Sequence, residues 1–136
     1  MMKSMGNFLL RILLGFVFLF TGVGKLFLGM IPADMISGIL NGMGMSFIPA
    51  MAFGYALGVI ELIVGLMLIL GLFTKITAWV AAVLLLSFII GVSIILGDGI
   101  AGSAMMFKDL GLLGGALALA FQGSSFMSMD TFLKER

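Results

Sequence analysis

Glu61 is the only carboxylate in VIELIVGLMLILGLFTK, an otherwise almost wholly apolar stretch that covers residues 59–75. A charged side chain near the centre of a bilayer costs at least about 2.5 kcal/mol, so such residues face a bundle interior, pair with a partner or serve a function. A carboxyl group can also hold a proton and transfer it to a neighbouring molecule. Glu61 is therefore our candidate catalytic residue for proton transfer, and a purely structural ion pair is the alternative that the sequence leaves open.

Three other charged residues are candidates for ligand binding. Arg11 and Lys25 are spaced to share one face of a helix but lie about 14 residues, or roughly 21 Å, apart along it. Glu61 could reach either of them, because it lies about 11 residues, or roughly 17 Å, into its own segment. Asp109 lies beside Lys108 near the outer end of the last apolar segment. Interfacial anchoring of the two cations, and stabilisation of Asp109 by a helix dipole, are the structural alternatives.

The composition places these residues in a membrane. Hydrophobic residues make up 62% of the 136-residue chain and charged residues only 10%, against about 25% charged in soluble domains. Four apolar segments are long enough to span a bilayer, at about residues 7–28, 50–72, 76–96 and 104–121. We therefore expect one all-α domain over residues 1–136, a polytopic membrane four-helix bundle. Pro32 and Pro49 bracket the first connection, where we expect a short interfacial helix from Ala33 to about Leu40.

Glycines recur at helical spacing in three of the four segments. Small residues on one helix face let two backbones approach closely in lipid, where no hydrophobic force drives association. Glu61 shares such a face in its segment, so it should turn away from lipid. The expected packing positions are Gly15 and Gly22 in the first segment, Gly54, Gly58 and Gly65 in the second, and Gly111 and Gly115 in the fourth.

The distribution of basic residues predicts the orientation. Lys75 and the two chain ends share one side of a four-span bundle, and Lys25 and Lys108 lie on the other. Cytoplasmic loops are enriched in Lys and Arg, so both termini should be cytoplasmic. The residues on that side are Lys3, Lys75, Lys134 and Arg136, with Arg11 near them. Near the end of the tail, Ser128 or Asp130 is a candidate N-cap of a short helix.

Several chemistries are excluded by what the sequence lacks. It contains no cysteine and no histidine, which excludes disulfides, iron–sulfur clusters, histidine-ligated haem and the usual zinc or copper sites within this chain. The 13 methionines are typical of adaptable packing, and we assign no metal site. A net charge of +1 is too small for a nucleic-acid surface.

The chain resembles the DoxX family of small four-helix membrane proteins. The resemblance rests on RILLGFVFLFTGVGKL, GVIELIVGLMLILGLFTKITAWVAA and KDLGLLGGALALAFQG followed by SMD. It implies a prokaryotic inner-membrane protein, a subunit or relative of quinone-linked oxidoreductases, whose characteristic polar positions fall on Arg11, Lys25, Glu61 and Asp109. Many family members carry a histidine near the end of the third span, and this chain has none.

Three functions remain open. The preferred one is a quinone-interacting subunit or accessory of a membrane oxidoreductase, in which Arg11 or Lys25 binds a quinone oxygen and Glu61 passes a proton. Its partners would be the lipid bilayer, a quinone and redox proteins, and homo-oligomerisation stays open. Its enzymatic role would be at most that of a quinone-linked subunit. The alternatives are a small transporter or proton pathway that uses Glu61, and a non-catalytic membrane scaffold.

Overall fold

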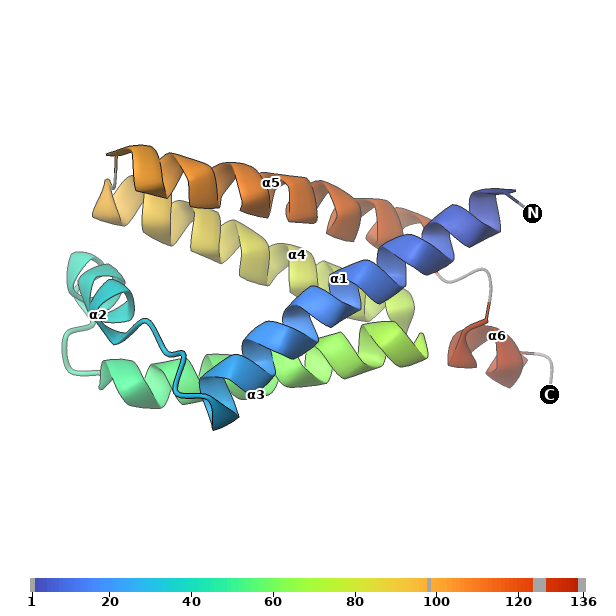
Figure 1. Cartoon of the computed structure of the whole chain (residues 1–136), viewed down its shortest axis with the longest axis horizontal. Coiled ribbons are helices and arrows are strands. Elements are labelled where there is room, and N and C mark those ends of the chain that lie inside the picture. Colours follow the sequence, from blue (N-terminus) through green and yellow to red (C-terminus); the bar gives the residue numbers. More distant parts are fainter. Residues whose placement is uncertain (1, 98, 124–126, 135–136) are drawn as a thin grey trace.

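The computed structural model describes residues 2–97, 99–123 and 127–134, and within these ranges all regular structure is helical (Figure 1). Four long helical segments run along the bundle, a short helix covers one end, and another lies at the other end. The elements in chain order are α1 (Met2–Phe27), α2 (Ala33–Gly42), α3 (Ala50–Leu70), α4 (Thr74–Ile90), η1 (Gly91–Leu96), α5 (Gly99–Gln122) and α6 (Met129–Lys134).

The expected all-α membrane bundle is confirmed. Three helical segments within the described residues are long and apolar enough to cross a membrane, namely Met5–Phe27, Ala50–Leu70 and Ala104–Gln122. The fourth, α4, has only 17 residues, and the π-helical turn η1 extends it by six. The short helix expected after Pro32 is also confirmed, as α2, which runs two residues past Leu40.

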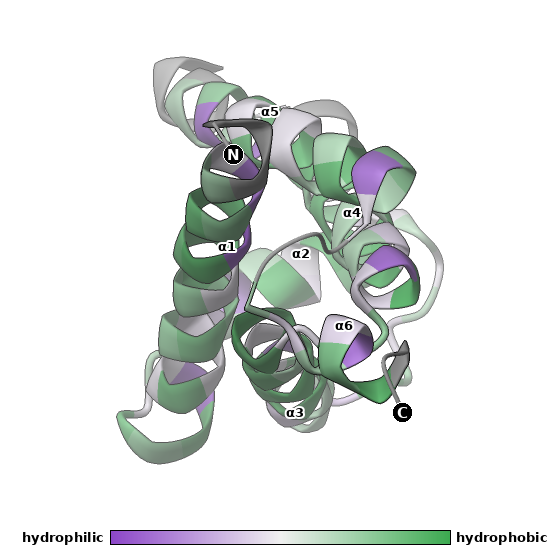
Figure 2. Cartoon of the chain, turned by 90° about the vertical axis from the view of Figure 1, so that its right-hand side faces the viewer, coloured by the Kyte–Doolittle hydropathy of each residue, from purple (hydrophilic) through white to green (hydrophobic). Residues whose placement is uncertain are grey.

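The N-terminus, the α3–α4 turn and α6 lie at one end of the bundle, as an even number of spans requires (Figure 1). Of the basic residues that predict the orientation, Lys75 lies at this end, at the start of α4, and Arg136 lies outside the described residues. Figure 2 views the chain from this end and shows mainly hydrophobic ribbons with a few hydrophilic positions.

The core lies where α1, α3, α4 and α5 face one another, and small residues make it compact. The fully buried alanines of α4 and α5 let these two helices run side by side, and larger side chains fill the space toward α1 and α3. The buried cluster consists of Leu14, Phe18, Val64, Leu68, Ala78, Ala81, Ala82, Leu85, Ala116, Leu119 and Ala120. Outward-facing side chains such as Leu13, Phe16 and Val83 are apolar as well, which suits a surface in contact with lipid.

The helices α1 and α3 touch backbone to backbone through their glycines. A Cβ built on Gly22 would lie 2.6 Å from the backbone nitrogen of Leu62, and one built on Gly15 would lie 3.0 Å from the carbonyl oxygen of Gly65. A Cβ on Gly65 would in turn collide with the backbone of Leu19. Because neither backbone can move away without opening the interface, these positions require glycine.

The other expected packing glycines have different surroundings. Gly54 faces Ile31 and Ile36, so it makes room for the connection and for α2 instead of α1. Gly115 lies against Leu10 of α1, whereas a Cβ on Gly111 would meet none of the described atoms within 4 Å. The packing contact expected for Gly111 is therefore absent in the described part of the chain, because α1 crosses α5 near Gly115 and then diverges from it (Figure 1).

Candidate functional site

A buried ion pair joins the middle of α3 to the end of α1. The Lys25 ammonium donates a hydrogen bond to Glu61 Oε2 over 2.6 Å, with the two side chains 14% and 2% exposed. Gly58, three residues before Glu61, makes this approach possible, because a Cβ there would lie 3.0 Å from Lys25 Cβ. Helix packing and the charged pair therefore depend on the same stretch of the α1–α3 interface.

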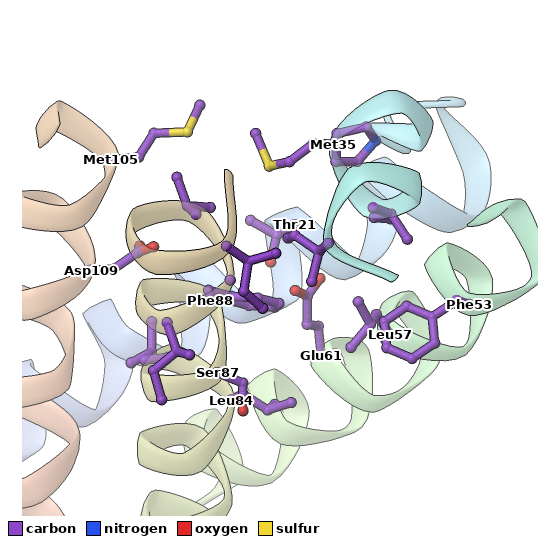
Figure 3. A pocket seen from close by; sticks show the side chains of 18 of the residues that line it. Thr21, Met35, Phe53, Leu57, Glu61, Leu84, Ser87, Phe88, Met105 and Asp109 are labelled. Atoms are coloured by element: carbon purple, nitrogen blue, oxygen red, sulfur yellow. The ribbon is translucent and has the colours of Figure 1, made fainter. Parts of the chain in front are cut away.

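Both members of this pair line a cavity of about 670 Å³ that all four long helices and α2 enclose. Figure 3 shows Glu61 and Leu57 entering from α3, Thr21 from α1, Phe88 from α4 and Met35 from α2. Most of the lining is apolar. Among the described residues, its polar side chains are Thr21, Lys25, Glu61, Ser87, Lys108 and Asp109.

A second carboxylate enters the same cavity from the opposite wall. Asp109 projects from α5 (Figure 3) and is buried. Its Oδ1 lies 3.3 Å from the ammonium of Lys108, whose side chain is 66% exposed. The cavity thus carries one enclosed ion pair, on the α1–α3 side, and one solvent- or headgroup-accessible pair, on the α5 side. A bound molecule could meet a carboxylate on either wall.

Two hydroxyl groups supply further hydrogen-bonding capacity in the cavity. Thr21 Oγ1 donates to the carbonyl oxygen of Phe18, and Ser87 Oγ donates to that of Val83. Each oxygen keeps lone pairs with which it can accept a hydrogen bond. Among the described residues, the cavity therefore offers two ammonium donors, two carboxylates and two hydroxyl acceptors within otherwise apolar walls.

Arg11, the remaining predicted ligand-binding residue, does not line this cavity. Its guanidinium is buried in the N-terminal half of α1, where Nη2 donates to the carbonyl oxygen of Met127 over 2.7 Å and the group lies 5.5 Å from the centre of the Phe8 ring. Of the two partners expected for Glu61, the structure forms the pair with Lys25. Arg11 instead binds the segment that follows α5.

Hydrogen bonds hold that C-terminal segment against the bundle, and the sequence did not predict this role for the residues that make them. Asn7 Nδ2 donates to the carbonyl oxygen of Gly123 over 2.6 Å. Asp130 accepts hydrogen bonds from the backbone N–H groups of Phe73 and Thr74, over 2.7 and 2.8 Å, and so caps the start of α4. Of the two N-cap candidates for the tail helix, Ser128 takes that position, since its Oγ accepts from the Thr131 N–H.

The α3–α4 turn explains why α4 needs a cap from elsewhere in the chain. Gly71 ends α3 in the left-handed conformation, with φ of +70°, and Phe73 follows at +46°. A bulky residue at positive φ is strained, and it has no side-chain oxygen with which to cap the helix that follows. The Asp130 carboxylate supplies both acceptors instead, and its negative charge also suits a helix N-terminus.

We expect Asp130→Ala to lower the free energy of unfolding by about 0.5–2 kcal/mol, the usual range for losing an N-cap acceptor. Thermal unfolding of the purified protein in detergent would measure the change. Asp34→Ala is the matched control, because Asp34 is exposed in the first turn of α2 and that helix has no side-chain cap. Equal stability of the Asp130→Ala protein and the parent would show that this cap contributes nothing.

The fold and the site together define a small multi-pass helical membrane protein with a mainly apolar cavity that contains a few charged side chains. A family model described as DoxX matches residues 6–94, so the chain belongs to the DoxX family. The matched region contains Arg11, Lys25 and Glu61, whereas Asp109 and the C-terminal segment follow it. The chain matches no curated protein and no solved structure.

Proposed function

We propose that the chain is a quinone-interacting subunit or accessory of a membrane oxidoreductase and that the cavity is its quinone site. The observation that carries the proposal is the Lys25–Glu61 pair, a hydrogen-bond donor joined to a proton carrier in the wall of an apolar cavity. Ligand sites of this kind measure about 300–1,000 Å³ and carry few polar groups, and the cavity volume of about 670 Å³ falls within that range.

Each polar group has a role suited to a quinone ring. An ammonium has three N–H donors; Lys25 uses one on Glu61 and can direct another to a ring carbonyl. A quinone that becomes a quinol takes up two electrons and two protons, and a partner redox protein supplies the electrons. Glu61 and Asp109, each ionised beside a lysine, take up one proton apiece and pass it to the ring oxygen on their own side.

Binding of a tail-less benzoquinone to the purified protein tests this proposal. We expect Thr21→Phe to weaken binding at least tenfold, because Thr21 lines the cavity next to Glu61 (Figure 3) and a ring at this position would fill the space. Val23→Phe, on the same helix but outside the lining, should change the affinity less than twofold. Isothermal titration would measure both. Failure of the parent protein to bind the quinone would refute the proposed function.

We also propose that the protein lies in the inner membrane of a prokaryote with both termini cytoplasmic. The excess of basic residues at the end with the termini supports this orientation. Fusions of a reporter that is active only in the cytoplasm should therefore be active at both ends of the chain. If a reporter that is active only outside the cytoplasm were active at either terminus, the proposed orientation would be wrong.

A further inference from the structure

We infer that the ligand of this cavity is a long-tailed, lipid-soluble quinone whose tail leaves toward the bilayer past Met105, between α5 and α2. This inference rests on the proposed function, and it adds the class of quinone and the route of its tail. Three observations support it. The cavity widens toward α2, its opening at Met105 borders the lipid-facing surface of α5, and the Lys25–Glu61 pair lies deeper than Met105.

The walls of the cavity separate toward the end that carries α2. Leu10 of α1 lies against Gly115 of α5, and Figure 1 shows the two helices diverging toward the end that carries α2. Within the widened part, Met105 projects from α5, and Met35 projects from α2 on the other side (Figure 3). Both methionines line the cavity, so α5 forms one wall of its outer part and α2 forms the facing one.

The α5 side of this opening belongs to the surface that faces lipid. Met105 is 44% exposed and lies in the apolar span Ala104–Gln122. The neighbouring Phe107 and Leu110 are also exposed and lie outside the cavity lining. The rim at Met105 is therefore continuous with apolar side chains that contact acyl chains, and a molecule leaving the cavity past Met105 enters the bilayer.

The order of the lining residues matches a molecule with a polar head and an apolar tail. Glu61 and Lys25 lie deep, where Glu61 is almost fully buried. Met35 and Met105 face each other in the outer part (Figure 3), and Met43 and Met45, from the connection after α2, also line the cavity. Methionine is flexible and apolar and adapts to irregular partners.

The volume leads to the same conclusion. A site of about 670 Å³ can enclose a substituted quinone ring and the first part of a tail. The tail of a membrane quinone contains tens of carbon atoms and exceeds this volume, so most of it must lie outside. The lipid-facing rim is the place where such a tail remains in an apolar environment.

The experiment compares two ligands in vesicles of phosphatidylcholine that contain the full chain. An azido-substituted benzoquinone without a tail labels the site, and two competitors displace it, namely the tail-less benzoquinone and the same ring with a ten-isoprene tail. Met105→Trp narrows the rim on the lipid side. Phe107→Trp is the matched control, since Phe107 is exposed on α5 but does not line the cavity.

We expect Met105→Trp to raise the concentration of tailed quinone needed for half-displacement at least tenfold, with less than a twofold change for the tail-less ring. Phe107→Trp should leave both values within twofold of the parent. The inference alone fails if the probe labels the parent protein and Met105→Trp alters both competitors alike or alters neither. If the probe does not label the parent protein, the proposed function fails and this inference fails with it.

Discussion

Lys25→Met is expected to lower the free energy of unfolding by about 3–5 kcal/mol, the range for removing one member of a buried ion pair. The loss is large because Glu61 is 2% exposed and its Oε2 would lose the ammonium that now lies 2.6 Å away. The carboxylate would then either remain buried without a counterion or bind a proton. Methionine is a suitable replacement, because it preserves most of the unbranched length of lysine and therefore the packing against Gly58.

Two further variants separate the charge effect from a packing defect. The double variant Lys25→Met/Glu61→Gln removes both charges and should regain most of the lost stability, because no uncompensated charge remains. Lys108→Met breaks the Lys108–Asp109 pair, but the Lys108 side chain is 66% exposed, so the free energy of unfolding should change by less than about 1 kcal/mol. The free energy of unfolding in detergent is the quantity to measure for all three variants. A Lys25→Met loss as small as that of Lys108→Met would mean that the buried pair does not stabilise the fold.

Much of the fold could be predicted from the sequence, because apolar length and proline positions act locally. Span lengths follow from bilayer thickness, and Pro32 and Pro49 mark where α2 and α3 can begin. The short α4 and its π-helical continuation were not predictable from these signals. The position at which the α-helix becomes a π-helix depends on packing against α2 and α5. The sequence of residues 76–96 is apolar on both sides of that position and does not mark it.

The candidate site was predictable in part. The glycine face of α3 indicated that Glu61 turns inward, but depth alone could not choose between Arg11 and Lys25. The choice depends on how far α1 slides along α3, and the close contacts of Gly22 with Leu62 and of Gly58 with Lys25 set that register. Such contacts arise only in three dimensions.

The role of Arg11 was missed for a different reason. Its acceptor is the carbonyl oxygen of Met127, which lies 116 residues later in the chain. No local sequence pattern indicates that the C-terminal segment packs against α1 and the α3–α4 turn. A buried arginine on a predicted membrane helix indicates that a partner exists, but in this chain the partner is a backbone oxygen, which has no signature in the sequence.

The last prediction is that Glu61→Gln gives a folded protein that lacks quinone-dependent electron transfer in its native membrane. Glutamine keeps the size of the side chain and an oxygen that can accept the hydrogen bond from Lys25, but it cannot carry a proton. Proton transfer by a positioned side chain contributes about 10²–10⁴-fold to a reaction rate, so activity should fall by at least about a hundredfold. Glu61→Ala should lose stability as well, because it also removes the partner of Lys25.

Membranes from cells that carry the variant in place of the parent chain provide the assay, with quinone reduction as the readout. Asp34→Asn is the matched control, because it also neutralises an acid but lies exposed on α2 outside the cavity lining. It should keep full activity. If the Glu61→Gln protein is as active as Asp34→Asn, no proton passes through this residue, and its purpose within the apolar segment is the ion pair with Lys25 alone.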